Sequence, residues 1–263
     1  MLKREARFWF YPLWVRLDAS QRSFKRWFEH AFEFQPTDTF VDVGAKYGKW
    51  ARAFSPQVAQ VILVDLGMPG YESDLYWAKH SYLRGVANSR FVQADVMRLP
   101  LASGSIDKIL CAEVLEHVPD PSTAFAEIQR VLRNHGIAVI TTPCSAFINA
   151  YRFPVTHLAR RLLPRPLQRK PLLRLSWPKW EKLVGHVHRG FTIDEMHALG
   201  RDVGLELIEF DYIHKRWGAY HWELMMGVPW LAVGSLPLLP IAYAWDRRFD
   251  MIGMNLLVAF RKS

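Results

Sequence analysis

The chain has 263 residues, of which 50% are hydrophobic, so it is long enough for one α/β domain with its own core. Its formal net charge of +9 and its pI of about 9.7 predict an anionic partner, either nucleic acid or an acidic membrane surface. The two cysteines, Cys111 and Cys144, are too few for a disulfide framework or a cysteine metal cluster, and they indicate a reduced, cytoplasmic compartment. We predict a single domain over residues 1–263.

The N-terminal segment, residues 1–35, mixes aromatic with basic side chains, a composition that suits a water–lipid interface. Its apolar run from Phe8 to Val15 is interrupted by Pro12 and lacks a small-residue cleavage site, so we expect no signal peptide. A helix capped by Asp18 is predicted to follow and to end before Pro36. Its apolar face should pack on the sheet and consists of Phe24, Trp27, Phe28, Ala31 and Phe32.

The stretch that follows reads as strand, tight turn, helix and strand. Thr39 to Val43 is rich in β-formers, and Gly44 and Gly48 bracket the predicted turn. A glycine turn lets the backbone approach a ligand closely and points free N–H groups at it. The next predicted strand ends at Asp65, whose carboxylate can accept hydrogen bonds from two ribose hydroxyls.

Three further strands are predicted before residue 144. Arg90 to Ala94 is followed directly by Asp95, and Ile106 to Ala112 runs into a loop rich in acidic residues. Asp120 should cap the next helix, and Gly136 to Thr142 should form the fifth strand. The buried face predicted for that helix consists of Phe125, Ile128, Val131 and Leu132.

The loop from Glu113 to Pro121 reads Glu-Val-Leu-Glu-His-Val-Pro-Asp-Pro and is the most specific signal in the chain. With the acid and glycines of the first turn, it resembles the class I S-adenosylmethionine-dependent methyltransferases, type 11 subgroup. Lys46 stands where the middle glycine of the family's first motif usually lies. The resemblance implies a Rossmann-like seven-stranded sheet with helices on both faces, and S-adenosylmethionine as the cofactor.

The resemblance also implies roles for individual residues. His117 is the candidate base and Glu116 its catalytic neighbour, although His117 could instead only position the cofactor or the acceptor. His186, His188 and Arg189 could orient the acceptor. The residues expected to bind the cofactor are Asp42, Gly44, Ala45, Gly48, Asp65, Leu66, Asp95, Val96 and Glu113.

A metal-dependent use of the same loop stays open. Glu113, Glu116 and His117 also resemble the Glu-x-x-Glu-His loop of ubiquinone-pathway O-methyltransferases, which can hold a divalent cation near a catechol. Carboxylate oxygens with one imidazole could bind such an ion. From the sequence we assign no residue as a metal ligand.

The C-terminal part, residues 191–263, is predicted to complete the sheet. Thr192 and Glu195 form a capping box, and strands are expected at Leu205 to Ile213 and at Met254 to Phe260. Two insertions, residues 144–190 and 214–253, follow strands five and six. Both leave the carboxyl ends of strands, which form the ligand-binding edge of such a sheet, so both should build the substrate lid.

The two insertions differ in chemistry. Residues 144–190 contain ten basic residues and one acidic residue, whereas Leu224 to Trp245 contains no charged residue and three prolines. The pair suggests peripheral contact with the anionic inner face of the cytoplasmic membrane and a small-molecule, quinone or lipid-linked sugar acceptor. An RNA methyltransferase is the second hypothesis, although the basic run has few aromatics for stacking bases. A non-catalytic binding protein that lost cofactor affinity through Lys46 is the third.

Overall fold

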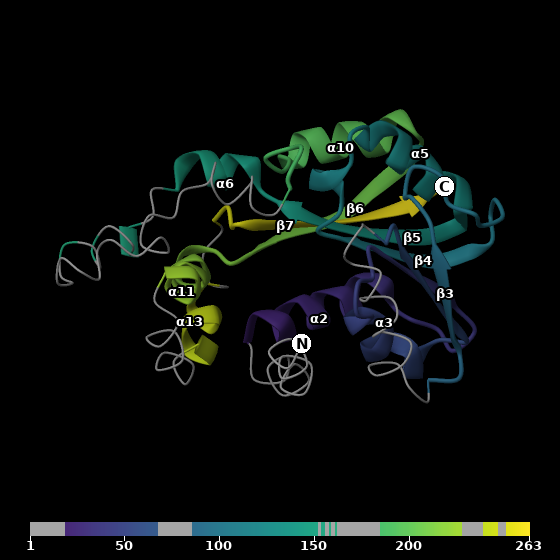
Figure 1. Ribbon diagram of the computed structural model, residues 1–263, viewed down its shortest axis with the longest axis horizontal. Helices are drawn as coiled ribbons and strands as arrows, with labels where there is room; N and C mark the ends of the chain where they lie inside the picture. Colours follow the sequence, from purple (N-terminus) through teal and green to yellow (C-terminus); the bar gives the residue numbers. More distant parts are fainter. Residues whose placement is uncertain are drawn as a thin grey trace. The chain divides into compact units, whose positions relative to one another are not determined.

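The protein is described here from a computed structural model (Figure 1). The structure describes residues 19–67, 86–151, 154–155, 158, 161, 185–227, 239–246 and 251–263. The chain forms two compact units. The larger unit comprises residues 29–143, 187–211 and 256–263, and the smaller unit comprises residues 1–28, 144–186 and 212–255. The prediction that the whole chain is one domain stays a prediction.

Seven strands form one sheet in the order β3-β2-β1-β4-β5-β7-β6. The strands are β1 (Thr39–Val43), β2 (Gln60–Asp65), β3 (Ser89–Gln93), β4 (Ile106–Ala112), β5 (Leu132–Pro143), β6 (Leu205–Ile213) and β7 (Asn255–Lys262). The pairs β1–β2, β1–β4, β2–β3 and β4–β5 are parallel. The predicted Rossmann-like, seven-stranded α/β fold is therefore confirmed.

Helices of the larger unit cover both faces of its sheet, as predicted. Helices α5 (Pro121–Val131) and α10 (Ile193–Asp202) lie together on one face, and α3 (Lys49–Phe54) lies on the other (Figure 1). Two 3₁₀ turns, η1 (Ser55–Gln57) and η3 (Leu115–His117), complete the helical elements that position the site.

Of the three predicted helix caps, two lie among the described residues, and both are present. Asp120 accepts hydrogen bonds from the N–H groups of Ser122 and Thr123, so it satisfies two donors that helix α5 leaves without an intrahelical partner. Thr192 and Glu195 form the reciprocal capping box at the start of α10. These local signals are reliable because the capping partners lie two or three residues apart.

The boundary between α5 and β5 differs from the prediction. Leu132 is not on the helix; it has extended backbone and begins β5, four residues before the predicted start at Gly136. The reason is a break in register, since Leu132 pairs with Ile106 whereas Ile137 pairs with Lys108. A bulge of this kind leaves extra residues unpaired, and spacing along the sequence does not reveal it.

The smaller unit contains α6 (Ser145–Ala150), α11 (Arg216–Gly227) and α13 (Leu239–Asp246), and α11 packs against α13 (Figure 1). Helix α2 (Ala19–Phe32) begins in this unit, and the five apolar residues predicted to be its inner face are all buried. The described helices include none with the length and hydropathy of a membrane span. Asp18, residues 1–18 and most of insertion 144–190, including all its basic residues except Arg161 and Arg189, lie outside the described residues.

Candidate active site

The strand register gathers the predicted site at one edge of the sheet. Val43 of β1 lies opposite both Val64 and Cys111, and Asp65 lies opposite Gln93. Because these strands are parallel, the segments that leave their carboxyl ends start side by side. The predicted residues in those ends or within two residues of them are Gly44, Asp65, Asp95 and Glu113.

The turn after β1 requires glycine. Gly44 and Gly48 both have left-handed backbone, with φ of +69° and +74°, and a Cβ on Gly44 would lie 2.3 Å from Cγ2 of Val114. Lys46, between them, also has a positive φ of +46°, which costs an L-residue roughly 1 kcal/mol. Its side chain is exposed, so a lysine fits where the family pattern has glycine.

The expectation that this turn presents free N–H groups is wrong for its first residues. The N–H groups of Gly44 and Ala45 donate to the carbonyl oxygen of Val64, at 2.8 and 3.2 Å. The N–H of Lys46 donates to the carboxylate of Asp65 at 2.8 Å. The end of β2 lies beside the turn and supplies these acceptors, so the turn is closed by its own neighbour strand.

Asp65 keeps capacity to bind a ligand despite this. Its Oδ2 accepts from Lys46 N–H, and its Oδ1 accepts from Gly67 N–H at 3.0 Å. A carboxylate has about four lone-pair sites, so two remain for hydroxyl donors. The side chain of Leu66 is 52% exposed beside it and offers an apolar surface at the same edge.

Asp42 lies behind the turn. It is buried, and its Oδ2 accepts a hydrogen bond of 3.0 Å from Ala51 N–H in the first turn of α3. Burial raises the pKa of Asp42 to about 7, from its ordinary value of 3.8. Asp42 therefore ties β1 to α3 and shapes the turn; its predicted contact with the cofactor stays a prediction.

Asp95 and Val96 form a tight turn after β3. The Asp95 Oδ1 accepts from Met97 N–H at 2.9 Å, its carbonyl oxygen accepts from Arg98 N–H, and Val96 is buried. Because Oδ1 is held by the Met97 N–H, the orientation of the carboxylate, and so the position of its Oδ2, is fixed.

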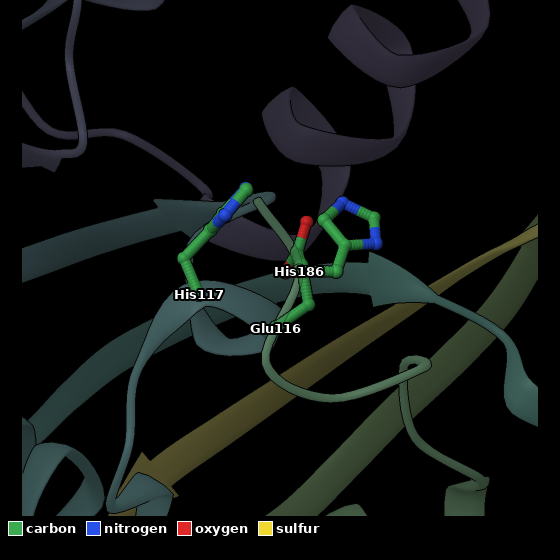
Figure 2. A group of neighbouring side chains, drawn as sticks. All are labelled: Glu116, His117 and His186. Atoms are coloured by element: carbon green, nitrogen blue, oxygen red, sulfur yellow. The ribbon is translucent and has the colours of Figure 1, made fainter. Parts of the chain in front are cut away.

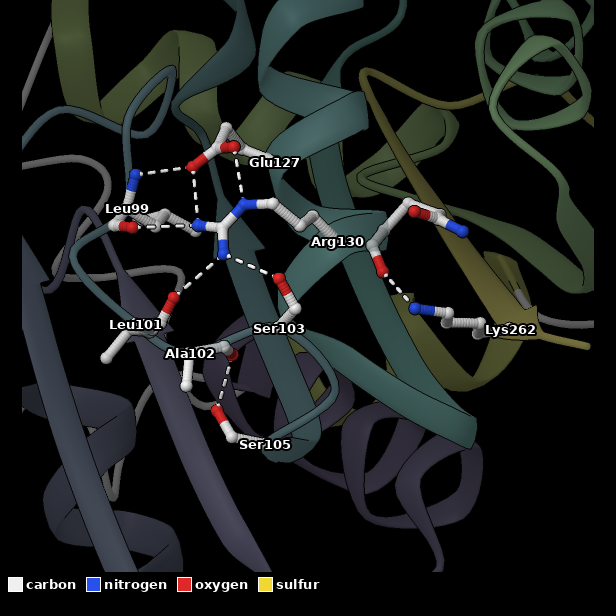
Figure 3. A network of polar contacts seen from close by, with 9 residues as sticks. Leu99, Leu101, Ala102, Ser103, Ser105, Glu127, Arg130 and Lys262 are labelled. Atoms are coloured by element: carbon white, nitrogen blue, oxygen red, sulfur yellow. Dashed lines mark hydrogen bonds and ion pairs between the residues drawn. The ribbon is translucent and has the colours of Figure 1, made fainter.

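Sequence reasoning missed the network that holds the next part of this loop (Figure 3). Arg130 of α5 donates to both oxygens of Glu127 and to the carbonyl oxygens of Leu99 and Leu101, the last two at 2.9 Å. Glu127 in turn accepts from Leu99 N–H at 2.8 Å. The i,i+3 spacing of Glu127 and Arg130 was visible in the sequence, but their loop partners lie about thirty residues away and were not.

The loop after β4 carries the catalytic candidates. Glu113 has a left-handed φ of +55°, and its Oε1 accepts from the hydroxyl of Thr141 at 2.9 Å. Glu116 is 1% exposed, and its Oε2 has no hydrogen-bond partner in the described part of the chain. Burial, and then the nearby carboxylate of Glu113, raise the pKa of Glu116.

Figure 2 shows Glu116 and His117, which leave the same 3₁₀ turn. The N–H groups of Val187 and His188 both donate to the Glu116 carbonyl oxygen, which fixes the chain directly after His186. The alternative in which Glu113, Glu116 and His117 hold a divalent cation stays a prediction.

The remaining acceptor candidates are placed differently from one another. The Nε2 of His188 lies 3.0 Å from the carbonyl oxygen of Val118, so this ring fastens its segment to the η3 loop. Arg189 is exposed. Gly190, with φ of +98°, is required because a Cβ there would lie 2.0 Å from the Pro143 carbonyl oxygen. Acceptor binding by these residues stays a prediction.

Comparison with known proteins agrees with this geometry. Residues 41–140 match the family model of a methyltransferase domain, Methyltransf_11. An uncharacterized methyltransferase of Mycobacterium sp. (strain JLS) is 36% identical over 103 residues, which are 39% of this chain and 38% of that protein. The uncharacterized methyltransferase YcgJ of Bacillus subtilis is 36% identical over 96 residues, 36% of this chain and 37% of that protein. The matches thus span less than two-fifths of either relative.

Among solved structures, geranyl diphosphate C-methyltransferase from Streptomyces coelicolor, in complex with Mg²⁺, geranyl diphosphate and S-adenosyl-L-homocysteine, has a TM-score of 0.61 at 16% identity. The alignment covers 92% of this chain and 78% of that one, and at this identity it establishes the fold. The glycine turn, the acids at the strand ends and the family match agree. Over residues 41–140 the chain thus carries a class I S-adenosylmethionine-dependent methyltransferase domain of the type 11 kind.

Proposed function

We propose that this protein transfers the methyl group of S-adenosylmethionine to a small-molecule, quinone or lipid-linked sugar acceptor at the inner face of the cytoplasmic membrane. One observation carries the enzymatic part of the proposal. The glycine turn, Asp65 and Asp95 meet the buried Glu116 and the adjoining His117 at one edge of the sheet. The groups that we propose to hold the cofactor and to accept the proton thus belong to the same edge.

The residues at this edge fit the cofactor. Asp65 has lone pairs left for the two ribose hydroxyls, and Leu66 and Asp95 flank the position expected for the base. At Gly44 the lack of a side chain leaves the room that Val114 needs and lets the backbone of the turn approach a ligand. When bound, S-adenosylmethionine supplies an electrophilic methyl group on a positively charged sulfur.

The chain's own residues have two tasks in this chemistry. They must hold the acceptor oxygen or nitrogen in line with the methyl group, and they must take its proton. His117 can accept that proton, since imidazole is the side chain best matched to neutral pH. Glu116, whose pKa is raised, keeps its proton to higher pH than an exposed carboxyl and can donate a hydrogen bond there.

The membrane part of the proposal rests on charge. Insertion 144–190 contains ten basic residues and one acidic residue, so its formal net charge of +9 equals that of the whole chain. Each Lys or Arg near an anionic membrane contributes roughly 1 kcal/mol of attraction. A lipid-linked or otherwise apolar acceptor would be met at that surface. RNA would also attract these charges, and a labelling experiment with lipid or RNA as the acceptor distinguishes the two classes.

The test uses purified protein, radiolabelled S-adenosylmethionine, and either a membrane lipid extract or total RNA. Label in the organic phase supports the proposal, and label only in the RNA overturns the acceptor class. His117→Ala should lower the rate by 10²- to 10⁴-fold, the usual contribution of a general base. His197→Ala is the matched control, because His197 is an exposed histidine of α10. Equal rates for both variants would remove His117 from the mechanism.

A further inference from the structure

The segment that follows β3 has few apolar anchors. We call residues 95–105 the Asp95 loop. Val96 and Leu99 are buried, but none of residues 101–105 is. A Cβ on Gly104 would meet no other heavy atom within 4 Å. The position of the loop therefore depends mainly on polar contacts with the element beside it.

Two side chains of helix α5 supply those contacts (Figure 3). Arg130 donates to the carbonyl oxygens of Leu99 and Leu101, both at 2.9 Å, and to the hydroxyl oxygen of Ser103 at 3.2 Å. Glu127 accepts from the Leu99 N–H at 2.8 Å. Both backbone polar groups of Leu99 are thus held by this pair, which fixes the loop near its middle.

The pair is itself held in one geometry. The Arg130 guanidinium binds the Glu127 carboxylate through two hydrogen bonds, of 2.7 and 2.9 Å. Because both groups are planar, this bidentate contact orients both side chains. The hydrogen bonds from Arg130 also lower the pKa of Glu127, so its carboxylate keeps its charge at neutral pH. The helix that carries the pair is anchored by its buried residues Ala124, Phe125, Ile128 and Val131.

The turn at Asp95 lies directly before this fixed point. Its Oδ1 accepts from the Met97 N–H and its carbonyl oxygen accepts from the Arg98 N–H, so every N–H from Met97 to Leu99 is bonded. Asp95 is half-buried and lies at the edge where the cofactor is expected. A displacement of Leu99 would therefore move the Asp95 carboxylate.

The chemistry at this place makes such a displacement matter. A carboxylate only accepts hydrogen bonds, so it favours the exocyclic amino group of adenine over the carbonyl oxygen that hypoxanthine carries at the same position. Hydrogen bonds weaken steeply when their length or angle departs from the optimum. The preference for adenine thus depends on where the Asp95 carboxylate is held.

We propose that Glu127 and Arg130 position the Asp95 carboxylate against the adenine amino group, and that they thereby set the selectivity of the site for S-adenosyl over S-inosyl ligands. The inference rests on the proposed function, because it explains how the cofactor of that reaction is recognised. Both are positioning residues on α5, and they act through the Asp95 loop without touching the cofactor.

The first experiment compares two ligands that differ only in the purine, S-adenosyl-L-homocysteine and S-inosyl-L-homocysteine. Isothermal titration calorimetry on the wild type should give about tenfold or greater preference for the adenosyl ligand, the size expected of a hydrogen bond to a charged group. Arg130→Met and Glu127→Ala should each reduce this preference to about threefold or less. The ratio of the two affinities is the readout, because a general loss of stability lowers both affinities alike.

Lys262→Met is the matched control. Lys262 donates two hydrogen bonds of 2.8 Å, to the carbonyl oxygens of Gln129 and Leu132, where α5 ends and β5 begins (Figure 3). Neither bond reaches the Asp95 loop, so the ratio should equal that of the wild type. A folded Arg130→Met or Glu127→Ala variant with the wild-type ratio, or an equal fall in the control, would overturn the inference.

The second experiment tests the route through Asp95. Asp95→Ala should abolish most of the preference for the adenosyl ligand, and the addition of Arg130→Met should change the ratio no further. A further fall in the double variant would show that Arg130 acts on the base by another route, which contradicts the inference.

The wild type separates this inference from the proposed function. Wild-type protein that binds both ligands equally would overturn the inference and leave the proposed methyl transfer standing. Wild-type protein that binds neither ligand would instead contradict the proposed function.

Discussion

The carboxylate of Asp65 and the backbone N–H of Lys46 are joined by a hydrogen bond of 2.8 Å, across the gap between β2 and the glycine turn. This bond gives Asp65 two functions: it holds the turn in its left-handed shape, and it keeps oxygen lone pairs at the edge where the cofactor is expected. The residue at position 46 contributes its backbone to this arrangement, so the departure from glycine leaves the bond intact.

Replacement of Asp65 by Ala should weaken S-adenosylmethionine binding by about 1.5 to 3 kcal/mol, the usual size for hydrogen bonds to a charged group. Asp65→Asn is the matched control: its single carbonyl oxygen can still accept one N–H of the turn, so it should lose less. Isothermal titration calorimetry measures both affinities. If Asp65→Ala binds as tightly as the wild type, the carboxylate does not hold the ribose.

Lys46→Gly should leave cofactor affinity within about threefold of the wild type. Glycine adopts the φ of +46° without strain, and this gain roughly offsets its greater loss of chain entropy on folding, so the free energy of unfolding should change by less than about 1 kcal/mol. Urea denaturation and calorimetry give the two quantities. More than tenfold weaker binding would instead mean that the lysine side chain contacts the ligand.

Gly44→Ala should destabilise the fold by about 1 to 3 kcal/mol, because the new methyl group would overlap Cγ2 of Val114 and the backbone has a positive φ. The double variant G44A/V114A removes the overlap but keeps the backbone strain. Gly44→Ala should therefore cost less stability when it is made in V114A than when it is made in the wild type. Thermal unfolding of all four proteins in the cycle measures the coupling. Simple additivity would contradict the packing of Val114 against this turn.

The Asp42→Asn variant should change how stability depends on pH. In the folded protein the pKa of Asp42 is raised to about 7 from 3.8, so between these values the folded state binds more protons than the unfolded state. The contribution of the Asp42 carboxyl to the free energy of unfolding is fully present below about pH 4. It decreases as the pH rises to about 7, by at most about 4 kcal/mol. Asn cannot ionise but can still accept from Ala51 N–H.

The free energy of unfolding of the wild type minus that of Asp42→Asn should therefore decrease from pH 4.5 to pH 7.5, measured in urea at constant ionic strength. A difference that stays level over this range would show that the carboxyl ionises in the folded protein as it does in the unfolded chain.

Local patterns along the sequence were sufficient for much of the fold. The strands at Thr39 to Val43 and Ile106 to Ala112, the cap at Asp120 and the capping box at Thr192 all depend on neighbours within a few residues. Their physics is short-range, since hydrogen bonds to helix ends and alternation in a strand need no distant partner. The order of acids after successive strands also predicted the cofactor edge.

Tertiary structure decided how those residues are used. The N–H groups of the glycine turn proved to be bonded to Val64 and Asp65, because β2 pairs alongside β1. Arg130 reaches loop carbonyls about thirty residues away, and Leu132 joins β5 through a pairing with Ile106. The sequence by itself determined which groups are available for chemistry. Their hydrogen-bond partners and their burial, which raises the pKa of Glu116, depend on segments that come together only when the sheet forms.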